Sequence, residues 1–298
     1  MRIVVTGREG QVARSLVERA ATRQGIEVIC LGRPSLDLAT PQSILPAVRA
    51  AQPDLVVSAA AYTAVDAAED ESERTHAVNG EGAGAVAQAA RLCGAPLIHL
   101  STDYVFSGES PGAYTEDMPT GPRSVYGLSK LAGERKVTEA HPDSVILRTS
   151  WVYSPFGRNF VRTMLRLAEG RDEVSVVDDQ TGNPTSALDI ADAVIDIAVR
   201  LHAGDAKRGI YHYAGLGRTT WCEFARHVFA ESAARGGPHA TVRAITTADY
   251  PTKATRPRNS SLDTRKITAD FGVRPVDWRA SVARVVDRLV AERLVPAH

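Results

Sequence analysis

The chain has few cysteines and no arrangement of them that suggests a cross-link. Only Cys30, Cys93 and Cys222 occur among 298 residues, far apart and without metal-binding spacing. Three scattered thiols provide no disulfide framework, so we expect buried free cysteines in a reducing compartment. The chain also lacks an apolar run long enough to span a bilayer and a charged leader followed by an apolar segment. These absences predict a cytoplasmic protein without a membrane segment.

Net charge is absent as well. Thirty-five basic and 35 acidic residues cancel, so no overall field attracts nucleic acid or an anionic membrane. We find no internal repeat and no low-complexity tract. What remains is an ordinary globular composition, 44% hydrophobic and 23% charged, in a chain long enough for one large or two smaller domains.

The first half of the chain alternates short apolar runs with helical patterns. The pattern predicts strands at residues 2–6, 27–31, 54–58, 96–100 and 144–148, with helices at about 11–23, from 40 onward, at 79–92 and from 126 onward. Thr40 is expected to be an N-cap, and so is Asn79. Buried strands that alternate with helices indicate a parallel sheet covered on both faces. We therefore predict an α/β fold with a Rossmann-type doubly wound parallel sheet.

The second half is more mixed. It has helical patterns at about 159–167, 185–201, 220–234 and 278–294, extended runs at 173–177 and 210–213, and a polar loop at 246–262. We assign residues 1–152 to a dinucleotide-binding domain and residues 153–298 to a smaller α/β substrate-binding domain. In an alternative division, residues of about 175–200 return to the first domain.

A glycine-rich turn joins the first strand to the first helix. Gly7 permits a sharp turn, and Gly10 lets the backbone approach a pyrophosphate at the helix N-terminus. The third small position holds Ala13, so the fingerprint is imperfect, and an ordinary strand–helix turn is the alternative. Arg33 follows the second strand, where an acidic residue would bind a ribose 2′-hydroxyl. An arginine there slightly favours NADPH over NADH, although exposed arginines are common.

Tyr126 and Lys130 lie four residues apart, on one face of a predicted helix. A lysine beside a phenol favours the phenolate and lowers the tyrosine pKa. A hydroxyl from Thr102 could orient a substrate carbonyl. Together the three groups indicate carbonyl reduction or alcohol oxidation, whereas the Tyr–Lys pair alone would more often be a solvated helix face.

With these motifs in place, the chain resembles the extended short-chain dehydrogenase/reductase family, and within it the dTDP-4-dehydrorhamnose reductases, over essentially its full length. The most specific strings are Ser-Thr-Asp-Tyr-Val-Phe at 101–106 and Arg-Thr-Ser-Trp-Val-Tyr at 148–153. Further matching strings lie at 6–12, 59–66, 126–130, 179–185 and 256–260. Tyr62 departs from the family pattern, because relatives often carry histidine there.

The resemblance implies NAD(P)H-dependent reduction of the C4 ketone of a dTDP-linked 6-deoxy sugar, with dTDP-4-dehydro-L-rhamnose converted to dTDP-L-rhamnose. Tyr126 would donate the proton, Lys130 would hold the nicotinamide ribose, and Thr102 would bind the C4 carbonyl. With the glycines of the turn and Arg33, the expected cofactor contacts are Gly7, Gly10, Gln11, Val12, Arg33, Asp37, Leu38, Ala61, Tyr62, Thr63, Tyr126 and Lys130. The expected substrate contacts are Thr102, Asp103, Trp151 and Arg256.

Several alternatives stay open at this point. Reductases of antibiotic sugars, such as dihydrostreptose synthase, share these motifs. A sugar-nucleotide dehydratase commonly has glutamate where Tyr104 follows Asp103, which argues against dehydration. A non-catalytic regulatory NAD(P)-binding subunit would often lose Tyr126 or Lys130.

We assign no metal ligands from the sequence. The acidic stretch at 66–73 is expected to be a solvated helix face, although its carboxylates could bind Mg²⁺ at an interface, for example in a homodimer. His76 and His99 are expected to be packing or polar side chains rather than metal ligands, since no second ligand lies at helical spacing. Arg256 and Arg258 could clamp a diphosphate or form a solvated pair in a polar loop.

Overall fold

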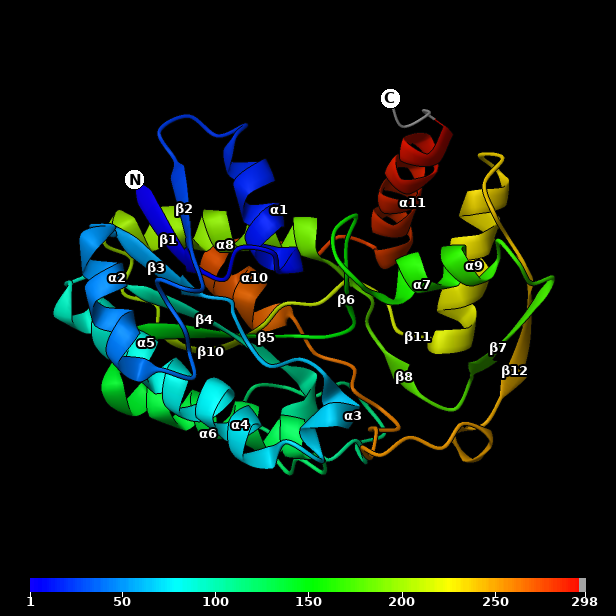
Figure 1. The fold of residues 1–298 in the computed structure, drawn as a ribbon, viewed down its shortest axis with the longest axis horizontal. Helices are drawn as coiled ribbons and strands as arrows, with labels where there is room; N and C mark the ends of the chain where they lie inside the picture. Colours follow the sequence, from blue (N-terminus) through cyan, green and yellow to red (C-terminus); the bar gives the residue numbers. More distant parts are fainter. Residues whose placement is uncertain (295–298) are drawn as a thin grey trace.

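A six-stranded parallel sheet forms the centre of the computed structural model, which describes residues 1–294 (Figure 1). Its strand order is β10-β5-β4-β3-β1-β2, so the chain reverses direction across the sheet between β1 and β3. The strands are β1 (Arg2–Thr6), β2 (Glu27–Leu31), β3 (Leu55–Ser58), β4 (Leu97–Thr102), β5 (Ser144–Thr149) and β10 (Gly209–His212). The predicted α/β class and doubly wound parallel sheet are confirmed.

Helices cover both faces of the sheet because alternate strand residues point to opposite sides. One face packs against α1 (Gln11–Ala20), α8 (Ala187–His202) and α10 (Arg265–Phe271), and Val57 lies in this core. The other face packs against α2 (Ile44–Ala50), α5 (Ala83–Leu92) and α6 (Val125–Ala140), and Val56 lies in that core. Burial on both sides explains why these strands are continuous apolar runs.

A smaller lobe follows the sheet, on the right in Figure 1. It contains the helices α7 (Phe160–Leu167), α9 (Trp221–Ala233) and α11 (Trp278–Leu294) and the parallel pair β7 (Glu173–Val177) and β12 (Thr241–Ile245). Its own apolar core includes Phe224, Val228, Trp278 and Val286. Since α8 and β10 lie with the sheet, the chain passes between the lobes more than once. The two-domain division stays a prediction.

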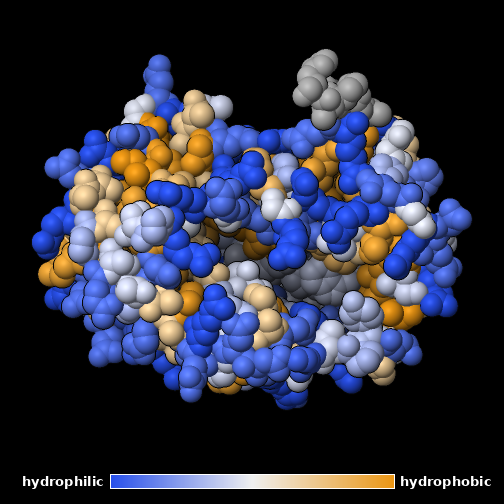
Figure 2. Space-filling view, in the orientation of Figure 1, coloured by the Kyte–Doolittle hydropathy of each residue, from blue (hydrophilic) through white to orange (hydrophobic). Residues whose placement is uncertain are grey.

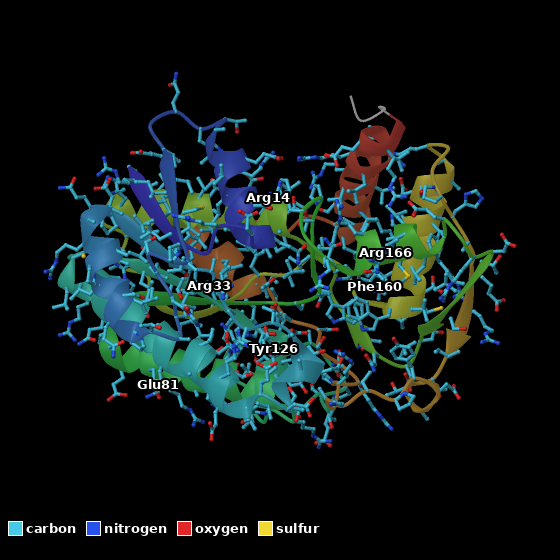
Figure 3. All side chains as sticks on the ribbon, viewed as in Figure 1. Arg14, Arg33, Glu81, Tyr126, Phe160 and Arg166 are labelled. Carbon is cyan, nitrogen blue, oxygen red and sulfur yellow. The ribbon has the colours of Figure 1, made fainter. Side chains whose placement is uncertain are left out.

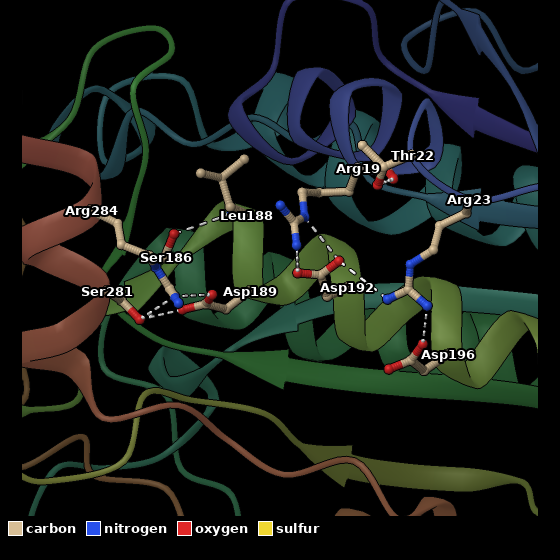
Figure 4. Close-up of polar contacts among 10 residues, drawn as sticks. All are labelled: Arg19, Thr22, Arg23, Ser186, Leu188, Asp189, Asp192, Asp196, Ser281 and Arg284. Carbon is tan, nitrogen blue, oxygen red and sulfur yellow. Dashed lines mark hydrogen bonds and ion pairs between the residues drawn. The ribbon is translucent and has the colours of Figure 1, made fainter. Parts of the chain in front are cut away.

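Helix α8 is bonded to elements of both lobes by buried or half-buried polar contacts (Figure 4). Towards α1, the Arg19 Nε donates to Asp192 at 2.9 Å. Towards α11, Asp189 accepts hydrogen bonds from Ser281 and, at 2.6 Å, from the Arg284 guanidinium. These contacts attach the last helix of the smaller lobe to the helix layer of the sheet.

Two predicted helix starts are wrong. Thr40 makes no side-chain capping bond; a short 3-10 turn at Pro41–Ser43 comes first, and α2 starts at Ile44. Pro46 then falls in the first turn of α2, where its missing N–H costs no intrahelical bond. Asn79 does not cap a helix either, because it lies inside a π-helical segment, Ala77–Gly82, that runs without a break from α4 (Ser72–His76) into α5.

All three cysteines are free, as the sequence predicts. The expected burial is confirmed for Cys222 and wrong for Cys30 and Cys93, which are half-buried. Within residues 1–294, no helix combines the length and the apolar character that crossing a bilayer requires.

Candidate active site

The candidate site lies at the carboxyl edge of the parallel sheet, where β1, β3, β4 and β5 all end. Open α/β sheets bind ligands at this edge, next to the point where the strand order reverses. Buried hydroxyl side chains gather there: Thr6, Ser58, Thr102 and Thr149. Figure 2 shows the surface hollowed between the two lobes on this side of the molecule.

The glycine turn after β1 has the geometry of an anion site. Gly7 has a φ of +100°, a left-handed backbone that favours glycine, and its N–H donates to the Leu31 carbonyl at 2.6 Å. Gly10 precedes α1 without a side-chain cap, and a Cβ added there would meet no atom within 4 Å. The first N–H groups of α1 have no side-chain cap and the space beside Gly10 is open, which suits a pyrophosphate. Ala13 is buried against the sheet, so the missing third glycine does not disturb the packing.

Gln11 connects this turn to the start of the smaller lobe. Its side-chain oxygen accepts a 2.8 Å hydrogen bond from Ser154, and its Nε2 donates to the Val152 carbonyl at 3.4 Å. Val12 is half-buried against the core of the sheet. The side chains of Gln11 and Val12 are therefore engaged, and these two residues could contact an anion only through their backbone N–H groups.

The residues expected around the adenosine lie at the end of β2. Arg33 is exposed there (Figure 3), and the Asp37 carboxylate accepts a 3.0 Å hydrogen bond from the Ala39 N–H, so it already braces its own loop. Leu38 is buried, and Gly82 packs so tightly on it that an added Cβ would lie 2.6 Å from the Leu38 oxygen. Arg8, which the sequence pattern did not single out, packs its aliphatic stem near Gly32.

Asn79 supports the loop after β3, which carries Ala61, Tyr62 and Thr63. Its side chain bonds both backbone groups of Tyr62, at 2.8 Å and 3.0 Å, and also donates to the Ser129 hydroxyl at 3.0 Å. Ser129 precedes Lys130, so Asn79 connects the loop to α6. Helical spacing gave no signal for this role, since it depends on a π-helical turn, a feature frequent at functional sites.

Tyr126 lies in the first turn of α6, which the Ser124 side chain caps by accepting from the Gly127 N–H at 3.1 Å. Its ring meets the Tyr104 ring edge-on, with centroids 5.6 Å apart. Figure 3 labels Tyr126 on the sheet side of the hollow and Phe160 on the smaller lobe. Burial raises the pKa of Tyr126, and the Thr102 hydroxyl opposes the increase. The structure therefore places Tyr126 beside Thr102, as its expected role requires.

Lys130 is buried, with 3% of its surface exposed, one helical turn beyond Tyr126. Its Nζ donates to the Leu100 carbonyl at 2.7 Å and lies 3.5 Å from the His99 Nε2. Burial lowers the pKa of Lys130 to about 8, and the Glu134 carboxylate partly offsets this. The expectation that Lys130 lowers the pKa of Tyr126 is wrong for this structure. The two residues share a helix face, but the ammonium is directed to β4, and the phenol pKa rises.

Asp103 is a buried carboxylate next to Thr102. The Thr102 hydroxyl donates to its Oδ1 at 2.9 Å, and its Oδ2 has no partner among the described residues. Burial raises the pKa of Asp103 to about 6, although the Ser260 and Thr102 hydroxyls lower it. An unpaired buried oxygen at this position is available to a ligand hydroxyl.

Trp151 has a strained backbone and a tightly defined ring position. Its φ is +47°, a region that side-chain-bearing residues rarely adopt. The ring stacks on Trp221 of α9 at a centroid distance of 3.6 Å, and its Nε1 donates to Ser260 at 3.1 Å. Gly182 faces the ring, and a Cβ there would lie 2.4 Å from it. Trp221 escaped prediction because its proximity to Trp151 depends on the packing of the smaller lobe.

Arg256 lies across the loop that follows β4. Its Nη1 donates to the Tyr104 hydroxyl at 3.0 Å, and its Nη2 pairs with Asp66 at 2.7 Å. Tyr104 in turn touches Tyr126, so Arg256 belongs to the same cluster. Its guanidinium is fixed on two sides by the protein.

The model of one protein family, the RmlD substrate binding domain, matches residues 1–291. The chain belongs to this family. It is 49% identical over 294 residues to a dTDP-4-dehydrorhamnose reductase of Sinorhizobium fredii, an alignment that covers 98% of this chain and 99% of that protein. The resemblance noted in the sequence is thereby confirmed.

Solved structures of RmlD family relatives have the same fold. A dTDP-4-dehydrorhamnose reductase of Clostridium acetobutylicum superposes with a TM-score of 0.90 at 32% identity, covering 97% of this chain and 99% of that one. A dTDP-4-dehydrorhamnose reductase of Bacillus anthracis in complex with NADP gives a TM-score of 0.88 at 33% identity, covering 95% of this chain and 98% of that one.

The RmlD-type site in this chain thus contains a phenol, a hydroxyl, a buried ammonium and an anion-binding turn at one sheet edge. Among residues 1–294, no group of three or more His, Cys, Asp or Glu side chains could hold a metal ion. The arrangement can bind a dinucleotide and transfer a proton to an oxygen atom beside Thr102 and Tyr126.

Proposed function

We propose that this protein catalyses the NADPH- or NADH-dependent reduction of the C4 ketone of dTDP-4-dehydro-L-rhamnose, giving dTDP-L-rhamnose. The full-length similarity to dTDP-4-dehydrorhamnose reductases carries the proposal, at 49% identity over 98% of this chain. Thr102, Tyr126 and Lys130 are all present, which favours an enzyme over a regulatory subunit. Tyr104 follows Asp103 where a dehydratase commonly has glutamate, which favours reduction.

In this mechanism the nicotinamide supplies a hydride to the sugar C4 when bound, and negative charge develops on the C4 oxygen. Tyr126 donates its proton to that oxygen. Its raised pKa keeps the phenol protonated before the reaction, as a proton donor requires. Thr102 would turn its one hydroxyl proton from Asp103 towards the same oxygen, and Lys130 would hold the nicotinamide ribose.

The cofactor fits the residues at the sheet edge. The uncapped N-terminus of α1 beside Gly10 would hold the pyrophosphate, and Ala61, Tyr62 and Thr63 would contact the inner portion of the cofactor. Arg33, with Arg8 near it, would pair with a 2′-phosphate, which favours NADPH. A lower KM for NADPH than for NADH would support this preference; equal values would remove it.

On the substrate side, Thr102 and Asp103 would bind the sugar, Trp151 would line its pocket, and Arg256 would approach the diphosphate. The Arg256 guanidinium is paired with the Asp66 carboxylate and bonded to the Tyr104 hydroxyl, so it would contact the diphosphate through its remaining N–H groups. The stacked Trp151 and Trp221 rings form an apolar wall suited to the unsubstituted face of a 6-deoxy sugar.

Oxidation of NADPH and NADH with dTDP-4-dehydro-6-deoxy-L-mannose tests the proposal, with the product configuration assigned by NMR. We expect turnover and dTDP-L-rhamnose. A panel of other dTDP-4-keto sugars distinguishes a reductase of antibiotic sugars, which would prefer another member of the panel. No turnover with either cofactor, combined with tight binding to a partner protein, would establish a regulatory subunit instead.

Mg²⁺, a homodimer and a cytoplasmic location are part of the proposal. Residues 66–73 provide carboxylates but no complete ligand set within the described chain, so a Mg²⁺ site there would need a second copy. Sedimentation tests the homodimer, and an activity assay with and without EDTA tests Mg²⁺. A monomer whose activity does not change with EDTA would exclude the homodimer and the Mg²⁺ site.

A further inference from the structure

Lys130 ends a chain of buried polar side chains that crosses two strands of the sheet. Its Nζ lies 3.5 Å from the Nε2 of His99 on β4, and the Nδ1 of His99 lies 3.0 Å from the hydroxyl of Ser58 on β3. His99 and Ser58 are each 1% exposed. Three residues from three elements are therefore joined end to end beneath the sheet edge.

Chemistry determines the direction of these hydrogen bonds. An ammonium only donates, so the His99 Nε2 facing it must accept. The proton of the neutral imidazole then sits on Nδ1, which donates to the Ser58 oxygen. Burial, together with the charge of Lys130, holds the pKa of His99 well below its usual value. His99 therefore stays a neutral acceptor across the physiological range.

We infer that His99, with its tautomer set by Ser58, is a positioning residue that holds the Lys130 ammonium for the proposed reaction. A lysine ammonium has three N–H donors on a flexible stem. The Leu100 carbonyl occupies one at 2.7 Å, and His99 occupies a second. The third remains for the nicotinamide ribose. The inference rests on the proposed function and adds two residues to its machinery.

The charged groups around Lys130 do not replace this acceptor. Glu134 lies one turn further along α6, but both of its oxygens are engaged by Arg148 of β5, and one also accepts from Ser101. Asp103, directly after β4, accepts a hydrogen bond from Thr102. The charge of Glu134 thus favours the protonated form of Lys130 without a hydrogen bond to it, whereas His99 contacts the ammonium directly.

The test compares His99→Leu, which removes the acceptor, with His99→Gln, whose amide oxygen can accept and whose amide nitrogen can donate. We expect kcat to fall about tenfold or more in H99L and to recover most of the loss in H99Q. His141 provides matched controls, because it is also buried and its ring bonds the Ala95 carbonyl at 3.0 Å, at the C-terminal end of α6 away from Lys130. H141L and H141Q are expected to keep the wild-type kcat.

The pH dependence separates positioning from a general packing defect. Loss of an acceptor destabilises the ammonium, so the pKa of Lys130 drops below its value of about 8. The alkaline limb of the kcat profile should therefore move to lower pH in H99L, by about one unit, and stay in place in H99Q and H141L. Ser58→Ala, which keeps the imidazole but frees its tautomer, is expected to shift the limb by a smaller amount in the same direction.

A measurement on the cofactor-free protein makes the inference independent of activity. The chain has only five lysines, so ¹³C-labelled lysine side chains can be titrated one by one by NMR, with Lys130→Met assigning the signal. A lower Lys130 pKa in H99L than in the wild type supports the inference. An unchanged Lys130 titration and an unchanged alkaline limb in a folded H99L, or equal effects in H99L and H141L, would overturn it. Inactive wild-type protein would instead overturn the proposed function.

Discussion

At the scale of single residues, Tyr126 shows how burial selects a chemical role. A phenol whose pKa is raised by burial stays protonated at neutral pH and can give a proton to a developing oxyanion. The Thr102 hydroxyl beside it opposes the increase in the pKa. Lys130 contributes little to the pKa of Tyr126 in the structure, because its ammonium bonds the Leu100 carbonyl.

Tyr126→Phe is expected to lower kcat by about 10²-fold to 10⁴-fold, the usual contribution of a general acid. Affinity for NADPH should change little, since the ring is retained. Steady-state kinetics and a fluorescence titration of the cofactor measure the two quantities. Tyr250→Phe is the control, because Tyr250 is 61% exposed. Near-normal activity of Y126F would remove Tyr126 from the mechanism.

Asp103 carries a cost in stability that depends on pH. Its pKa of about 6 lies above that of an unfolded aspartate, so the native state binds the extra proton and stability falls as pH rises from about 4 to 6. The full cost above that range is about 3 kcal/mol at roughly 1.4 kcal/mol per pKa unit. Asp103→Asn removes the ionisation while keeping the shape.

Urea unfolding at several pH values tests this linkage. The unfolding free energy of the wild type relative to D103N should decrease by about 2 kcal/mol between about pH 4.5 and pH 8. A difference that stays constant with pH would show that Asp103 ionises in the folded protein as it does in the unfolded chain.

At the scale of elements, α6 carries Tyr126 and Lys130 and is bonded to β5 by a buried ion pair. The Arg148 Nη2 lies 2.7 Å from the Glu134 Oε2, and the two side chains are 2% and 3% exposed. A buried pair that loses one partner leaves an uncompensated charge. Glu134→Gln is therefore expected to lower the unfolding free energy by about 3–5 kcal/mol.

A surface pair on the same helix is the matched control for E134Q. Lys136 contacts Glu81 at 3.1 Å, but both side chains are largely exposed, so Glu81→Gln should cost at most about 1 kcal/mol. Denaturant unfolding of both variants gives the comparison. Equal costs would show that the buried pair does not stabilise the position of α6.

At the scale of the whole molecule, a hollow lies between the large lobe and the smaller lobe (Figure 2). Gln11 and Ser154 connect the two sides at 2.8 Å, and α8 connects them through Asp189 and Arg284. These bonds hold the turn, the phenol and Trp151 in one frame.

Cofactor binding should stabilise this frame through the turn after β1. At 100 times its Kd, NADPH adds about 2.7 kcal/mol to the unfolding free energy and raises Tm by several degrees. Gly10→Val places side-chain atoms in the open space beside the α1 N-terminus, where a Cβ meets no atom within 4 Å. We expect G10V to keep the Tm of the cofactor-free protein and to lose the NADPH shift, in a thermal unfolding assay. If NADPH raised the Tm of G10V as much as that of the wild type, the pyrophosphate would bind elsewhere.

The sequence by itself determined the elements and the identity of the reactive groups. Continuous apolar strands such as residues 2–6 and 144–148 indicated a parallel sheet, because only burial on both faces favours such runs. The glycines of the turn and the strings around Thr102, Tyr126 and Trp151 identified the sheet edge and the family. These features are local in the chain, so spacing and residue type were enough to recognise them.

Only the tertiary structure decided how those groups act on one another. His99, Asn79 and Trp221 lie far in sequence from the residues they contact, and no periodicity relates them. The directions of the pKa changes at Tyr126, Lys130 and Asp103 also follow from burial, which depends on how the strands, α6 and the polar loop before α10 pack together. A one-dimensional pattern identifies a proton donor, but its environment sets the free energy of moving the proton.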